Sequence, residues 1–167
     1  QVTLSFGITE YGNLKKFIQK YINANGKYKD QLASYVSKIG TTSLVNDLNF
    51  IQILKSAGTD PIMQQCQDSA FEEYYIAPAL SWSASNGFTL PLSKLVISDS
   101  FLHSGSILKF LRNKFEEKPP ISGGDEKKWI SEYCRVRREW LSNASLQALR
   151  NSVYRMHFMQ DCIRNND

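Results

Sequence analysis

Residues 125–141 read DEKKWISEYCRVRREWL, and this stretch decides the fold class. Asp125 is a typical first residue of a helix, because its side chain can accept a hydrogen bond from a free backbone N–H of the first turn. Behind it, one set of residues recurs every three or four positions, as on one face of an α-helix. That face consists of Trp129, Ile130, Tyr133, Cys134, Arg137, Trp140 and Leu141. The stretch therefore predicts a long helix with one buried face.

The same helical spacing recurs along most of the chain. Apolar positions predict helices around residues 14–22, 32–39, 48–54, 62–76, 80–84, 92–102, 107–115 and 146–163. Asp60-Pro61 is a strong helix start, and Pro78 either kinks a helix or begins the next one. No segment alternates long enough to be a core strand, although Val2 to Phe6 could form one edge of a hairpin. We predict a mostly α fold with seven or eight helices and a possible small β-hairpin at the N-terminus.

Composition narrows the class of protein. A chain of 167 residues with 42% hydrophobic content predicts one domain spanning residues 1–167. The net charge of +4 is spread along the chain, so we expect no nucleic-acid partner, and no apolar run approaches the ~20 residues of a membrane span. Because the chain begins at Gln1 and its first residues do not resemble a signal peptide, we expect a piece of a longer protein.

Cysteines and histidines give no sign of a metal site. Cys66, Cys134 and Cys162 lie far apart, and the chain has only two histidines, so we expect neither a metal nor another cofactor. The simplest interpretation is three buried thiols. A Cys134–Cys162 bridge stays open if the last two helices pack side by side.

Asp99 is the most unusual acid in the sequence, because an otherwise apolar segment surrounds it. A buried carboxylate needs a partner, and Arg137 and Arg155 lie on inward faces of later helices. We predict a buried network of these three residues, which would serve either as a structural ion pair or as support for a catalytic acid. His103 has no Ser or Cys nucleophile motif beside it, which favours a helix C-terminal cation or a hydrogen-bond donor.

Two other acids stand near loops. Glu10 lies in a loop rich in glycine, hydroxyl and amide groups, where it either complements a helix dipole or takes part in chemistry. Asp125 follows two glycines, and its loop could also hold a ligand.

Five segments, taken in order, resemble the family 46 chitosanases and the lysozyme-like superfamily. They are FGITEYGNL (6–14), DPIMQQCQD (60–68), SDSFLHSG (98–105), GGDEKKWI (123–130) continuing to Arg138, and VYR (153–155). The resemblance implies a two-lobed, mostly helical fold with a glycan in a cleft between the lobes. It also implies that a Glu protonates the leaving oxygen and that an Asp further along activates water.

The resemblance assigns roles to particular positions. Both catalytic acids would precede Gln1, so this chain would be truncated at its N-terminus and only Glu10, Thr3 and Ser5 are left as catalytic candidates. Thr3 or Ser5 falls near the residue that holds the attacking water. Asp99, Arg137 and Arg155 match the residues that support the catalytic Glu. The predicted glycan-binding residues are Thr9, Tyr11, Asn13, His103 and Asp125.

The substrate is predicted from charge. A positive protein attracts an anionic polymer, so the net charge favours peptidoglycan, the cell-wall glycan, over cationic chitosan. The segments also resemble cell-wall-cleaving effector domains of bacterial secretion-system spike proteins, which implies secretion or delivery to the periplasm and an immunity protein that fills the cleft. The alternatives are a chitosanase and a catalytically empty module that binds a glycan or a protein.

Overall fold

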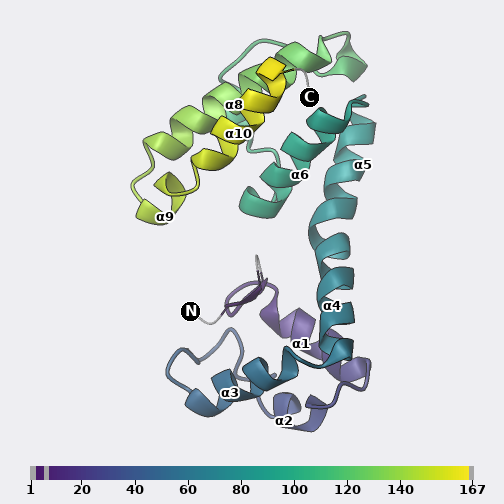
Figure 1. Cartoon of the computed structure of the whole chain (residues 1–167), viewed down its shortest axis with the longest axis vertical. Helices are drawn as coiled ribbons and strands as arrows, with labels where there is room; N and C mark the ends of the chain where they lie inside the picture. Colours follow the sequence, from purple (N-terminus) through teal and green to yellow (C-terminus); the bar gives the residue numbers. More distant parts are fainter. Residues whose placement is uncertain (1–2, 6–7, 166–167) are drawn as a thin grey trace. The chain divides into compact units, whose positions relative to one another are not determined.

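The structure is a computed structural model that describes residues 3–5 and 8–165, with the backbone alone for residues 3–5. The chain divides into two compact units, residues 1–74 and 75–167. The boundary falls within a π-helical turn, η1 (Glu72–Ile76). Figure 1 shows the elements of each unit. No helix in the described ranges is both long and apolar enough to cross a bilayer.

The first unit begins with a hairpin and continues with four helices. Strands β1 (Thr3–Ser5) and β2 (Ile8–Thr9) pair antiparallel, with Thr3 opposite Thr9 and Ser5 opposite Ile8. This confirms the predicted small hairpin. The helices are α1 (Leu14–Asn23), α2 (Lys29–Ala33), α3 (Leu48–Ala57) and α4 (Pro61–Phe71). Helix α1 buries Leu14, Phe17, Ile18 and Tyr21, the face that the sequence predicted, and it packs against α2 and α4.

Asp60 ties these helices together. One carboxylate oxygen accepts from the backbone N–H of Ile62 at 3.0 Å and so begins α4, while the other accepts from the Tyr21 hydroxyl at 2.5 Å and the Lys27 N–H at 2.8 Å. The Tyr21 hydrogen bond holds the pKa of Asp60 below its usual 3.8. Burial, together with the same bond, raises the pKa of Tyr21 to about 12. The end of α1 and the start of α4 therefore share one buried carboxylate.

The second unit is helical in its described residues. It contains α5 (Ala77–Ser85), α6 (Pro91–Ser104), α7 (Lys109–Arg112), a short 3₁₀ turn η2 (Pro120–Ser122), α8 (Glu126–Ser142), α9 (Gln147–Arg150) and α10 (Tyr154–Asn165). Helices α8 and α10 lie side by side, and both contact α6 (Figure 1). Asp125 begins α8 as predicted, accepting from the Lys128 N–H at 2.8 Å.

Trp129 lies at the centre of the second core. Its ring is fully buried. The Phe88 ring lies edge-on to it with a centroid distance of 4.8 Å, and the Tyr133 ring stacks on it with a centroid distance of 5.3 Å.

The predicted possible bridge between Cys134 and Cys162 is not formed. Cys134 is buried on α8, Cys162 is half-buried on α10, and both are free. Burial raises the pKa of Cys134 to about 12, which keeps this thiol protonated.

Three predicted helices differ from the structure, and one of them, expected over 107–115, spans only Lys109–Arg112. The helix expected over 32–39 ends at Ala33, and the helix expected over 146–163 is divided into α9 and α10. At both places a hydroxyl bonds a nearby carbonyl: Ser34 Oγ donates to Gln31 O at 2.8 Å, and Ser152 Oγ donates to Leu149 O at 2.7 Å. Such local bonds compete with helix continuation. Within the described part, seven α-helices have nine or more residues, in line with the predicted seven or eight.

Replacing Asp60 by Asn is expected to lower the melting temperature at neutral pH and to make the protein less sensitive to acid. Because the folded-state pKa of Asp60 is depressed, its charge stabilises the fold above the unfolded pKa, and this contribution is lost as the pH falls through the folded value. Thermal melts followed by circular dichroism at about pH 7 and about pH 3 measure both effects. Asp68→Asn, at an exposed position of the same helix, is the matched control. An equal loss in both variants would contradict this role for Asp60.

Candidate active site

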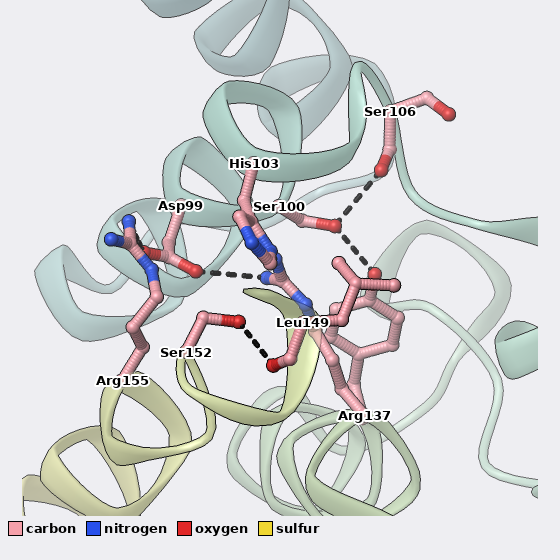
Figure 2. A network of polar contacts seen from close by, with 9 residues as sticks. Asp99, Ser100, His103, Ser106, Arg137, Leu149, Ser152 and Arg155 are labelled. Carbon is pink, nitrogen blue, oxygen red and sulfur yellow. Dashed lines mark hydrogen bonds and ion pairs between the residues drawn. The ribbon is translucent and has the colours of Figure 1, made fainter. Parts of the chain in front are cut away.

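Helices α6, α8 and α10 each contribute one side chain to a buried ion network in the second unit (Figure 2). Arg137 Nη1 on α8 donates to Asp99 Oδ2 on α6 at 2.9 Å. Arg155 on α10 pairs with the other oxygen, Asp99 Oδ1. Asp99 is 8% exposed and Arg137 is fully buried. The structure confirms the prediction that Asp99 is buried and paired with these arginines.

The network continues through His103, and the next residue after Asp99, Ser100, makes a separate pair of hydrogen bonds. His103 lies four residues after Asp99 on α6, and its Nδ1 is 3.0 Å from Arg137 Nη2. Ser100 Oγ donates to the Ser106 carbonyl at 2.9 Å, and the Tyr133 hydroxyl lies 2.6 Å from the same oxygen. Because the serine has only one proton to give, Tyr133 is the donor in this second bond. Burial raises the pKa of Tyr133, which agrees with a protonated hydroxyl.

Arg137 has an unused hydrogen-bond donor within this network. Two guanidinium groups face one carboxylate, and burial together with both arginines lowers the pKa of His103, so the imidazole adds no charge at neutral pH. The buried Nε of Arg137 also has no hydrogen-bond partner among the described residues. A further carboxylate would accept from this N–H, since a buried guanidinium group is stable when its charge and its N–H groups are paired. The network is therefore suited to hold a further anionic group.

Glu10 lies in the first unit as a buried residue. It is 1% exposed, and its Oε1 accepts from the backbone N–H of Leu44 at 2.5 Å. This bond fixes the segment after Gly40, whose backbone has a positive φ of 82°. The burial favours a structural carboxylate over one that meets a polysaccharide, and the catalytic role of Glu10 stays a prediction.

The other predicted residues are divided between the units. Thr9, Tyr11 and Asn13 surround the N-terminus of α1, with Tyr11 57% exposed and Thr9 and Asn13 half-buried. Asp125 is exposed in the second unit, where it begins α8. The backbones of Thr3 and Ser5 lie in β1, but their side chains are outside the described part, as are Phe6 and Gly7 of the first resembling segment. The structure gathers Asp99, His103, Arg137 and Arg155, and it leaves the remaining assignments as predictions.

Sequence reasoning missed Ser100 and Tyr133. Both lie close in sequence to residues that were predicted: Ser100 follows Asp99, and Tyr133 precedes Arg137 by one helical turn. Helix periodicity already placed Tyr133 on the same buried face as Arg137, but it assigned Tyr133 no polar partner. The loop carbonyl of Ser106 could not have been found in this way, because it depends on the turn at Gly105, whose φ is 77°.

Residues 6–165 match the sequence profile of glycosyl hydrolase family 46. The chain belongs to this family. The match covers nearly the whole chain, including the ion network and the residues around α1.

Similar proteins include a chitosanase from Bacillus subtilis (strain 168), which is 25% identical over 175 residues. The alignment covers 95% of this chain but 63% of the relative, so the chain spans less than two thirds of that protein's length. Among solved structures, a mutant chitosanase from Bacillus subtilis MY002 complexed with 6 GlcN has a TM-score of 0.78 at 25% identity, covering 94% of this chain and 72% of that one.

A second solved structure supports the fold. The family 46 chitosanase from Gynuella sunshinyii, in complex with chitotetraose, has a TM-score of 0.80 at 19% identity over 94% of this chain and 72% of that chain. The mostly helical, lysozyme-like fold predicted from the sequence is therefore confirmed.

Replacing Asp99 by Ala is expected to cost roughly 3–5 kcal/mol of unfolding free energy, because it leaves the buried guanidinium of Arg137 and the half-buried one of Arg155 without their carboxylate. Urea unfolding at neutral pH measures this loss. Asp161→Ala on α10 is the matched control, since Asp161 is exposed and pairs with Arg164 at the surface. Such a surface pair contributes ~0–1 kcal/mol. If Asp99→Ala is no more destabilising than Asp161→Ala, the network does not hold the second unit together.

Proposed function

We propose that this family 46 chain acts on chitosan, as a glycoside hydrolase that cleaves bonds between glucosamine units. The observation that carries the proposal is the match to a family whose relatives are chitosanases and include complexes with 6 GlcN and chitotetraose. The ion network supports the proposal, because a buried arginine with an unused donor can hold the carboxyl group of a catalytic acid.

Peptidoglycan was the substrate favoured by the net charge, and the comparisons do not support it. They also give no support to the effector-domain hypothesis or to the immunity protein that it implied. The charge argument is weak because net charge sums the whole surface, whereas a polymer meets only the groups that line its binding site. A chain with a net charge of +4 can therefore still bind a cationic glycan.

The proposed role of the network follows from its charge. In glycosidic cleavage one carboxyl group gives a proton to the leaving oxygen and ends as a carboxylate. The guanidinium group of Arg137 would stabilise that carboxylate through its positive charge. Arg137 Nε is the free donor that would contact it. Asp99 itself is not available as the acid, since both of its oxygens accept from arginine.

The position of the general acid and of the water-activating base stays a prediction: both are expected before Gln1. A test is to assay residues 1–167 beside a version that includes the sequence encoded upstream, each checked for helical circular dichroism. We expect chitosan cleavage to be at least ~10²-fold faster in the longer version, the low end of one acid or base contribution. Equal cleavage by residues 1–167 would instead place the active pair within this chain, with Glu10 as the first candidate.

The substrate class can be tested by binding, which does not require the catalytic pair. We expect residues 1–167 to bind a glucosamine hexamer and not peptidoglycan fragments, with chemical-shift changes at Asn13 and Tyr11. Asn13→Ala should weaken binding, whereas Asn23→Ala, at an exposed position of the same helix, should not. Tighter binding of the peptidoglycan fragments would overturn the proposal. Binding of the hexamer without cleavage, even by the upstream-extended version, would favour the alternative of a glycan-binding module.

A further inference from the structure

His103 contacts the ion network through one nitrogen. It lies one turn after Asp99 on α6, so both side chains project from the same face of the helix. Figure 2 shows its imidazole directed at the Arg137 guanidinium. The distance from His103 Nδ1 to Arg137 Nη2 is 3.0 Å. Arg137 therefore has two partners at its terminal nitrogens, the Asp99 carboxylate at Nη1 and the His103 ring at Nη2.

This geometry fixes the protonation of the ring. A guanidinium group is always a donor, so Nδ1 must accept the hydrogen bond with its lone pair. The imidazole is then neutral and carries its one proton on Nε2. A doubly protonated ring would direct an N–H at another N–H, and Arg137 would lose its second acceptor.

The ionisable groups around the ring come from α6 itself and from two helices that pack against it, α8 and α10. Arg137 is on α8 together with Tyr133 and Cys134, and Arg155 is on α10, while Asp99 lies on α6 itself. Helix α5 packs against α6 as well, but none of its residues from Ala77 to Ser85 is ionisable. Burial, and then Arg137 and Arg155, lower the pKa of His103 below 6.5, and Asp99 only partly opposes them.

We propose that His103 is a positioning residue for Arg137: its neutral ring holds the guanidinium in the orientation that reaches Asp99, and uptake of a second proton releases it. Protonation would place three cations around one buried carboxylate. Acid would then loosen the network at its histidine. As far as this concerns catalysis, the inference rests on the proposed function, because Arg137 is the residue expected to contact the general acid.

The effect on stability has a definite sign. A base whose folded pKa is lowered binds fewer protons in the folded state than in the unfolded state, so stability rises with pH across this window. The full contribution of neutral His103 is present above the unfolded value of about 6.5, and it is lost as the pH falls toward and through the folded value.

The direct test is a nuclear magnetic resonance titration of residues 1–167, which contain two histidines, His103 and His157. The second is exposed on α10, and His157→Gln assigns the two imidazole signals. We expect His103 to show the Nε2–H tautomer at neutral pH, with a titration midpoint below 6.5. An Nδ1–H tautomer, a ring that is charged at neutral pH, or a midpoint at or above 6.5 would overturn the proposal.

Two variants separate positioning from packing. His103→Gln keeps a side-chain acceptor that does not titrate, so its melting temperature should fall less than that of the natural protein between about pH 7.5 and about pH 5. His103→Leu keeps apolar volume but loses the acceptor, and it should be less stable than His103→Gln at the higher pH. His157→Gln should keep the natural pH dependence.

The outcomes are distinct. Unchanged pH dependence in His103→Gln, or equal stability of the Leu and Gln variants at the higher pH, would contradict a positioning role. None of these measurements requires glycan cleavage, so the inference can fail while the proposed chitosanase function stands, and the reverse is equally possible.

Discussion

Arg137 is fully buried, so the second unit must offset the desolvation free energy of its guanidinium group. A buried guanidinium is tolerated only when its N–H groups find acceptors and its charge finds a carboxylate. Asp99 supplies the charge and His103 supplies an acceptor, both from one face of α6. Helix α10 adds Arg155 to the second oxygen of the same carboxylate. The three helices are thus held in register by one carboxylate, in addition to the apolar contacts around Trp129.

Much of this arrangement could be read from the sequence, because its parts follow helical spacing. Asp99 stood out as a charge in an apolar segment, and Arg137 fell on the inward face of a helix whose start at Asp125 was visible. The helix ends at Ala33 and near Ser152 were not predicted, since they depend on hydroxyl–carbonyl bonds that compete with continuation by small energy differences. Glu10 was harder still, because its partner is a backbone N–H 34 residues away.

Charge was informative at close range, whereas at long range it favoured a substrate that the comparisons do not support. The pairing of Asp99 with two arginines follows from the cost of a buried ion, which acts over one hydrogen bond. The preference for an anionic polymer used the sum of 20 basic and 16 acidic residues, most of them exposed and screened by salt over about 10 Å. Substrate charge is decided by the few groups that touch the polymer, and their identity requires the fold.

The placement of the aromatic core has a spectroscopic consequence. All three tryptophans, Trp82, Trp129 and Trp140, belong to residues 75–167, whereas tyrosines occur in both units. Fluorescence excited selectively in the indole rings therefore reports on the second unit alone, because residues 1–74 contain no tryptophan. Far-ultraviolet ellipticity reports on helices in both. Comparing the two signals during denaturation shows whether the units lose their structure in one cooperative step or in two.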